Sequence, residues 1–294
     1  MGELAEIALR HAGPTLVTPT LLPQLEVLCS HHRSAPVPSV HRPSLCFLAQ
    51  GAKEVTFGGK VYRYEAGEFL VSTVDLPVTG EIVEAMPRKP YLCFALGIDS
   101  AVVQEVLRDA SESLVERRSS DGPSIFVGRN SPAVSDAVLR LARCLDDAVD
   151  RVVLAPGIIR EIVYRLMQGK FGAVVREVGI VGSRTQRIAK AIAQLKNGFA
   201  QSLRVEELAR LAAMSPSTFH EHFKRVTALS PLQYQKRLRL HEARRLLLAE
   251  DTSAADVGFR VGYQSPSQFS REYARFFGHP PRMDIHQLVG VPGR

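Results

Sequence analysis

A short phrase occurs twice in the C-terminal third of the chain, fifty residues apart. Ser-Pro-Ser-Thr-Phe at 215–219 returns as Ser-Pro-Ser-Gln-Phe at 265–269, and a second aromatic residue follows four positions later in each copy. In the same register, Arg210 aligns with Arg260 and Pro231 with Pro281. Serine before proline is typical of a helix start, because serine caps the first turn and proline needs no hydrogen-bond partner there. The repeat predicts two helix-turn-helix units, each of which places one helix in a DNA major groove.

The positive charge of the chain is concentrated in the half that carries this repeat. Residues 183–294 hold 18 Lys and Arg against 9 Asp and Glu, whereas residues 1–182 hold 19 against 21. An excess of cations attracts the phosphates of DNA, although it can also be an ordinary solvated surface. The coincidence of charge and repeat favours DNA binding. The 294 residues are enough for two domains, which we place at 1–178 and 183–294.

The sequence lacks the marks of several other protein classes. It has no run of about 18 apolar residues that would predict a membrane span, and its first residues do not form a secretory signal. The four cysteines are isolated from one another, so we expect reduced thiols and no zinc motif. A cytoplasmic protein without a membrane partner is therefore expected.

The N-terminal domain is predicted to begin with short strands and to end with helices. Between residues 40 and 98, apolar runs alternate with turn residues such as Gly58 and Gly59, which indicates a small barrel or sandwich. Helices are expected at 131–149 and 156–168, whereas 108–130 are expected to be loop with a weak strand.

The helix predicted over 131–149 carries an apolar stripe with two interpretations. The stripe consists of Val134, Val138, Leu141, Leu145 and Val149, at spacings of four, three, four and four residues, and its first four residues are the candidates for dimerisation. It can pack on the barrel of its own domain, or it can pair with the same stripe of a second chain in a homodimer. The sequence does not choose between these alternatives.

The region from Leu203 to about Asp284 resembles the AraC/XylS family of bacterial transcription regulators. The resemblance rests on the phrases MSPSTFHEHFKRVTALSPLQYQKRLRLHEARRLLL and VGYQSPSQFSREYARFFGHPP. The N-terminal phrases HRPSLCFLAQGAKEVTFGGKVYRYEAGEFLVSTVDLPVTGE and PYLCFALGID are similar to one branch of that family. The resemblance implies an α+β protein of two domains, a cupin-like β-barrel with flanking helices and an all-α tandem helix-turn-helix domain.

The resemblance also implies which side chains face DNA. The base-reading positions are Ser217, His220 and Glu221 in the first recognition helix, and Ser267, Gln268 and Arg271 in the second. Phosphate contacts are expected from Thr218, Lys224, Arg225, Ser270 and Arg275. Arg271 can donate two hydrogen bonds to guanine and Gln268 can pair with adenine, whereas Glu221 can only accept. We expect more arginine-based readout from the second unit.

Two residues of the C-terminal domain depart from the family pattern. Ala228 stands where many members have glycine, which predicts a less tight turn after the first recognition helix. After Pro281 the chain continues Arg-Met-Asp, where the family often has Tyr-Arg, so the resemblance gives no support for the last helix.

The N-terminal domain has no catalytic signature. Residues 42–98 contain no histidine, although catalytic cupins bind metal through closely spaced histidines and a glutamate. A nucleophile elbow, a phosphate-binding loop and paired carboxylates are also absent from the sequence. We expect no enzyme activity, metal or cofactor, and a domain that binds a small molecule at residues that the sequence does not identify.

The predicted function is a sequence-specific DNA-binding transcription regulator, modulated by a small-molecule effector in the barrel. The family resemblance favours an activator that contacts RNA polymerase and acts as a homodimer. One alternative is an architectural or weakly specific DNA-binding protein whose barrel only dimerises. Another is a metal-dependent barrel enzyme with an accessory DNA-binding domain.

Overall fold

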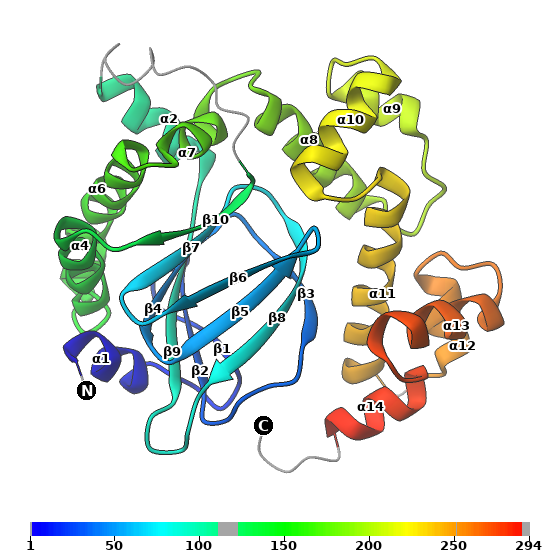
Figure 1. Cartoon of the computed structure of the whole chain (residues 1–294), viewed down its shortest axis with the longest axis horizontal. Coiled ribbons are helices and arrows are strands. Elements are labelled where there is room, and N and C mark those ends of the chain that lie inside the picture. The colour runs from blue at the N-terminus through cyan, green and yellow to red at the C-terminus, as the bar shows by residue number, and fades with distance from the viewer. Residues whose placement is uncertain (1, 111–122, 251, 290–294) are drawn as a thin grey trace. The chain divides into compact units, whose positions relative to one another are not determined.

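The chain folds into two compact units, which are described separately (Figure 1). The computed structural model describes residues 2–110, 123–250 and 252–289. The first unit takes most of the chain up to Gln186, and the second takes the chain from Arg187 onward. The domain limits of 178 and 183 are the prediction from the sequence.

Two sheets form the centre of the N-terminal unit, and they do not close into a single barrel. The six-stranded sheet has neighbouring strands in the order β1 (Val17–Pro19), β2 (Leu25–Ser30), β9 (Tyr91–Gly97), β4 (Ser44–Gln50), β7 (Glu68–Ser72) and β10 (Ile125–Arg129). All of its pairs are antiparallel. The four-stranded sheet has the order β3 (Val37–His41), β8 (Leu76–Glu84), β5 (Ala52–Phe57) and β6 (Lys60–Glu65). The arrangement is cupin-like, as expected.

The hairpin predicted at Gly58 and Gly59 is confirmed. These residues connect β5 to β6 with φ angles of 58° and 77°, a region in which glycine meets no steric penalty. The segment 108–130 contributes β10 over its last residues, in agreement with the expected weak strand. Residues 111–122 of that segment lie outside the described part of the chain.

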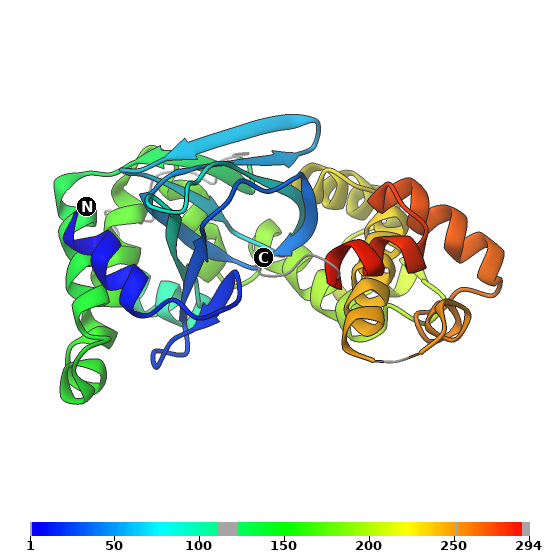
Figure 2. The same ribbon diagram turned by 90° about the horizontal axis from the view of Figure 1, so that it is seen from below.

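Helices cover one face of the six-stranded sheet (Figures 1 and 2). They are α1 (Glu3–Arg10), α2 (Ser100–Asp109), α4 (Pro132–Arg143), α6 (Ala155–Gln168) and α7 (Gly172–Gly179). The short helix α5 (Ala148–Val153) contacts α6 and buries none of its own residues. Alternate strand residues such as Leu45 and Phe47 point to this layer and share one apolar core with Ile162 of α6. The core arises because side chains along a strand alternate between its two faces.

The helix expected at 131–149 is two helices in the structure. It begins as predicted, with Ser131 as the N-cap and Pro132 in the first turn, but α4 ends at Arg143. Asp147 then caps α5, because its carboxylate accepts hydrogen bonds from the backbone N–H groups of Val149 and Asp150 at 2.7 and 2.9 Å. A local cap of this kind stops a periodic stripe from continuing as one helix. The helix expected at 156–168 is present as α6.

The apolar stripe of α4 and the turn after it belongs to the core of its own unit. Val134, Val138, Leu141 and Leu145 are each at most 5% exposed and pack with the strands and with α6. Their burial corresponds to the first of the two interpretations. Val149, the fifth residue of the stripe, lies on α5 and is 67% exposed. A dimer interface along this stripe stays a prediction.

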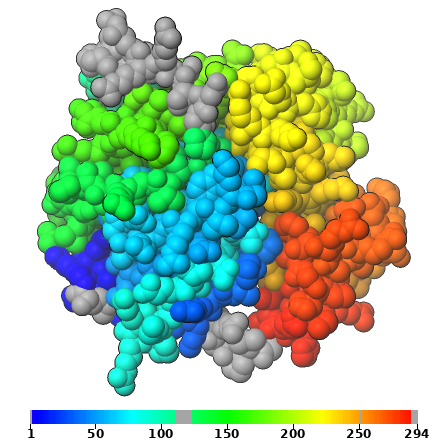
Figure 3. All heavy atoms as spheres, in the orientation of Figure 1, coloured from blue at the N-terminus to red at the C-terminus, as the bar shows by residue number. Residues whose placement is uncertain are grey.

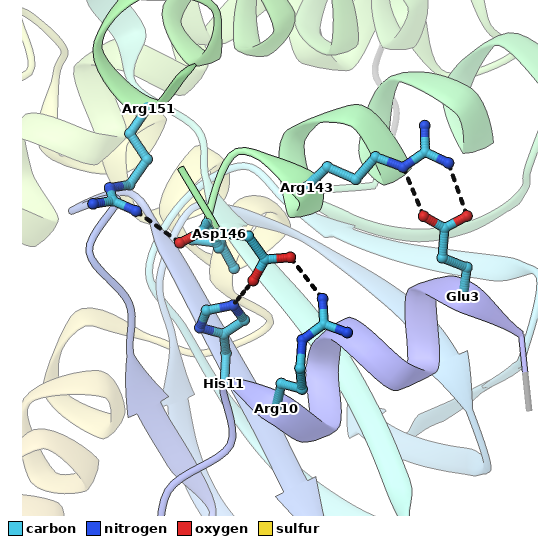
Figure 4. Close-up of polar contacts among 7 residues, drawn as sticks. Glu3, Arg10, His11, Arg143, Asp146 and Arg151 are labelled. Atoms are coloured by element: carbon cyan, nitrogen blue, oxygen red, sulfur yellow. Dashed lines mark hydrogen bonds and ion pairs between the residues drawn. The ribbon is translucent and has the colours of Figure 1, made fainter. Parts of the chain in front are cut away.

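Helix α1 is fixed to the end of α4 by exposed ion pairs (Figure 4). Arg143 donates two hydrogen bonds to Glu3, at 2.7 and 2.8 Å, and Arg10 donates to Asp146 at 2.6 Å. Asp146 also contacts His11 at 2.9 Å, and these two hydrogen bonds hold the pKa of Asp146 below its ordinary value. Exposed pairs contribute little stability individually. The buried face of α1 holds most of this attachment, through Ala5, Ile7 and Ala8.

The C-terminal unit is all-helical. Its helices are α8 (Arg184–Asn197), α9 (Val205–Leu211), α10 (Pro216–Thr227), α11 (Pro231–Ala249), α12 (Ala254–Arg260), α13 (Pro266–Phe277) and α14 (Pro281–Val289). The pairs α9–α10 and α12–α13 are the two predicted helix-turn-helix units, and α11 connects them (Figure 1). The whole protein is therefore a two-domain α+β chain.

Candidate nucleic-acid interface

The first recognition helix, α10, is oriented by its aromatic residues. Ser215 caps it by accepting a hydrogen bond from the Thr218 backbone at 3.3 Å. Phe219 and Phe223 are completely buried, and their rings contact each other in a tilted arrangement with centres 5.4 Å apart. Burial of this face forces the opposite face outward. The exposed side chains include Ser217, Thr218, His220, Glu221, Lys224 and Arg225.

The second recognition helix, α13, follows the same plan. Phe269 and Tyr273 are completely buried, with ring centres 5.5 Å apart. The exposed side chains include Ser267, Gln268, Arg271 and Arg275, while Ser270 is partly buried. Both recognition helices contribute to the surface of the C-terminal unit (Figure 3). The structure thus places the side chains predicted for DNA contact on two helices of one unit.

The start of α13 has a serine cap but no capping box, although the sequence Ser-Pro-Ser-Gln at 265–268 is typical of one. Ser265 caps the helix by accepting from the Gln268 backbone at 3.4 Å. The Gln268 side chain instead donates to Glu272, one turn later, at 3.1 Å. This bond one turn along the helix competes with the backward reach by which the Gln268 carbonyl oxygen would accept from the Ser265 N–H in a capping box. A complete capping box, which the sequence reasoning missed, lies at the start of α11 between Ser230 and Gln233.

Glu272 is the centre of a polar network that sequence reasoning also missed. Besides Gln268, it accepts hydrogen bonds from Tyr263 at 2.9 Å and from Lys236 of α11 at 3.0 Å. Three donors on one carboxylate outweigh its partial burial, and the pKa of Glu272 is lowered. The network connects Gln268, a predicted base-reading side chain, to helix α11.

The two units differ by one residue in their turns. The positioning helices α9 and α12 begin at Val205 and Ala254, 49 positions apart, whereas the recognition helices begin at Pro216 and Pro266, 50 apart. The sequence match of Arg210 with Arg260 is therefore not a structural equivalence. The turn after α12 contains the extra residue.

The recognition helices end in the same conformation although their last residues differ. Ala228 adopts a left-handed φ of 57° after α10, and Gly278 adopts a φ of 87° after α13. The alanine forms the left-handed cap that glycine ordinarily provides, at some steric cost. The looser turn expected at Ala228 is not seen.

The last helix, for which the family pattern gave no support, is held by a buried carboxylate. Asp284 of α14 accepts hydrogen bonds from Arg244 at 2.8 and 2.9 Å and from the Tyr273 hydroxyl at 2.7 Å. The side chains of Asp284 and Arg244 are 5% and 16% exposed. Burial and the neighbouring Asp284 carboxylate raise the pKa of Tyr273 above its ordinary value. The network joins α14 to both α11 and α13.

Two further observations concern other kinds of site. Within residues 2–110, 123–250 and 252–289, no three His, Cys, Asp or Glu side chains gather as a metal site would require. None of the helices in these ranges is both long and apolar enough to span a membrane.

Known proteins resemble the chain in both units. Residues 21–174, more than half of the chain, match the AraC-type transcriptional regulator N-terminus, and residues 208–284 match a helix-turn-helix domain. The activator RhaS of Klebsiella pneumoniae strain 342 is 39% identical over 101 residues, which are 34% of this chain and 36% of that protein. RhaS of Salmonella agona is 32% identical over 161 residues, which are 52% and 56% of the two chains. The chain thus spans about a third to just over half of the length of these relatives.

A solved structure resembles almost the whole chain in fold. ToxT of Vibrio cholerae, crystallised with an unsaturated fatty acid, covers 91% of this chain and 95% of its own, with a TM-score of 0.57 and 9% identity. An identity this low shows the fold alone.

Fold and sequence matches together define a two-domain protein with a helix-turn-helix domain at its C-terminal end. Its recognition helices are paired, and a cupin-like domain precedes them. The chain belongs to the family of AraC-type transcriptional regulators.

Proposed function

We propose that this protein is a sequence-specific transcription regulator that reads two major-groove segments with α10 and α13. The observation that carries the proposal is the matched construction of these helices: each buries an aromatic pair and exposes polar and basic side chains. The unit is also strongly cationic, as phosphate binding requires. Such pairs of recognition helices place base-contacting side chains in the groove.

The chemistry of the exposed side chains gives each recognition helix a different role. On α13, Arg271 fits guanine and Gln268 fits adenine, with Ser267 beside them. On α10, Glu221 fits cytosine, and Ser217 and His220 complete the face. Phosphate contacts are assigned to the remaining exposed donors, Thr218, Lys224, Arg225, Ser270 and Arg275.

The cupin-like unit is proposed to bind a small-molecule effector and not to catalyse a reaction. Support comes from the fatty acid in the ToxT crystal, which has the same fold. The RhaS relatives are named activators, which favours activation through RNA polymerase in the cytoplasm, where bacterial DNA lies. A homodimer is also proposed, and an interface along the 131–149 stripe stays a prediction.

The proposal is tested by selecting DNA sites from a random pool with the full-length protein and measuring affinity against unrelated DNA. A specific regulator prefers its site by about 10³-fold or more at physiological salt. A preference below about tenfold would support the architectural alternative instead. Calorimetry with fatty acids and other metabolites tests the effector. The sensor role fails if no ligand changes DNA affinity and removal of residues 1–182 leaves regulation intact.

A further inference from the structure

Arg239 of the connecting helix α11 is bound to backbone carbonyl groups from two separate parts of the C-terminal unit. Its Nε donates to Phe199 O at 2.8 Å, and its Nη2 donates to Ala200 O at 3.2 Å and Gln201 O at 2.9 Å. Its Nη1 donates to Gly262 O at 2.9 Å. The guanidinium therefore joins the segment before α9 to the turn between α12 and α13.

A second side chain of α11 holds the same segment. The Gln235 amide, one turn before Arg239, donates to Phe199 O at 2.9 Å and to Gln201 O at 2.7 Å. Phe199 itself packs against the apolar core around α12 and α13. The segment 199–201 is thus fixed to the second helix-turn-helix unit, although in the chain it leads directly into α9 of the first.

The contact between segment 199–201 and Gly262 leaves no space for a side chain. Gly262 has a φ of 94°, and a Cβ atom placed there would lie 2.2 Å from Ala200 O and 2.9 Å from Arg239 Cζ. Both the conformation and the close approach require glycine. The neighbouring Tyr263 ring lies 5.9 Å from the guanidinium carbon of Arg239, within cation–π range.

We infer that Arg239 and Gly262 form a clasp that fixes the mutual orientation of α10 and α13, and so sets the spacing of the two half-sites in the DNA. The inference rests on the proposed DNA-reading function. A single connecting helix sets the distance between the two helix-turn-helix units. It still lets the units bend and twist relative to each other at its two ends. The clasp adds a second connection between the units, and two connections remove this freedom.

The clasp continues to the base-reading surface through the network around Glu272. Tyr263, which follows Gly262, donates to Glu272, and Lys236 of α11 donates to the same carboxylate. Glu272 in turn accepts from Gln268. A displacement of the turn at Gly262 would therefore move the side chain that is proposed to read adenine.

The test uses the full-length protein and its selected DNA site in three forms: natural spacing, one base pair added between the half-sites, and one removed. One base pair rotates the half-sites by about 34°. We expect the wild type to lose affinity at least about tenfold with either altered spacing. Arg239→Met, which keeps the length but removes every donor, is expected to bind the natural site about tenfold more weakly and to distinguish the spacings by less than about threefold. Its affinity for an isolated half-site should not change.

Arg245→Met is the matched control, because Arg245 lies on the same helix and, among the described residues, forms its ion pair with Glu242 on that helix. It should keep the wild-type spacing preference. If Arg239→Met does not fold, as judged by its thermal unfolding, Arg239→Lys and Gly262→Ala take its place with the same expectation. If the Arg239 or Gly262 variants keep the full spacing preference, the clasp is wrong but the proposed DNA-reading function stands. The same conclusion follows if they lose affinity for the half-site and for the full site equally. A wild type without site preference overturns the proposed function as well.

Discussion

Replacement of Asp284 by alanine should destabilise the C-terminal unit strongly. The carboxylate is 5% exposed, receives two hydrogen bonds from Arg244 and accepts a third from the Tyr273 hydroxyl. Removing one partner of a buried ion pair leaves an uncompensated charge and costs about 3–5 kcal/mol. The lost tyrosine hydrogen bond is part of the same network, so its cost does not simply add. A domain has only about 5–15 kcal/mol of stability, so the variant should lose about a fifth or more of it.

The measurement is urea unfolding of the full-length chain, followed by helical circular dichroism because the sequence contains no tryptophan. Arg244→Met and the double variant complete a double-mutant cycle, in which we expect a coupling energy of about 2–3 kcal/mol. Glu242→Ala is the control, because its pair with the exposed Arg245 should contribute less than about 1 kcal/mol. A loss below about 1 kcal/mol for Asp284→Ala, or additive single variants, would refute the role of this network in holding α14.

Three other substitutions have expected outcomes. Arg271→Ala should cost about 1–3 kcal/mol on the selected site and relax the choice at one base pair, whereas equal loss on every sequence would make it a phosphate contact. Ser215→Ala should cost about 1 kcal/mol in urea unfolding, and no loss would contradict its capping role. Burial and nearby arginines lower the pKa of His241 to about 4. Only the unfolded chain then binds this proton between about pH 6.5 and 4, so stability falls over this range as pH falls, by up to about 3 kcal/mol. His241→Phe should remove that part of the pH dependence, and an unchanged pH profile would contradict it.

Local signals explain what could be predicted from the sequence. The recognition helices followed from Ser-Pro caps and aromatic spacing, which act within one helical turn, and the hairpin followed from Gly58 and Gly59. The features that were missed depend on contacts between distant residues. Asp284 holds α14 through Arg244, 40 positions away, and Arg239 contacts carbonyl groups 38 to 40 positions away.

Competition between nearby groups explains the remaining differences. The cap at Asp147 interrupts a stripe whose periodicity alone predicts one helix. The Gln268 side chain donates to Glu272 in place of closing a capping box with Ser265. In both places two local preferences were visible in the sequence, and only the packed structure decided between them.

Two alanines with left-handed backbone conformations make the two helix-turn-helix units of the C-terminal unit differ in how well they tolerate substitutions. Ala213 and Ala228 have φ angles of 50° and 57° in the first helix-turn-helix unit, whereas the matching turns of the second use Gly262 and Gly278. A left-handed non-glycine residue costs about 1–2 kcal/mol. The first helix-turn-helix unit therefore has less reserve against further destabilising substitutions, and its α10 surface has less freedom to acquire a new base preference than the surface of α13.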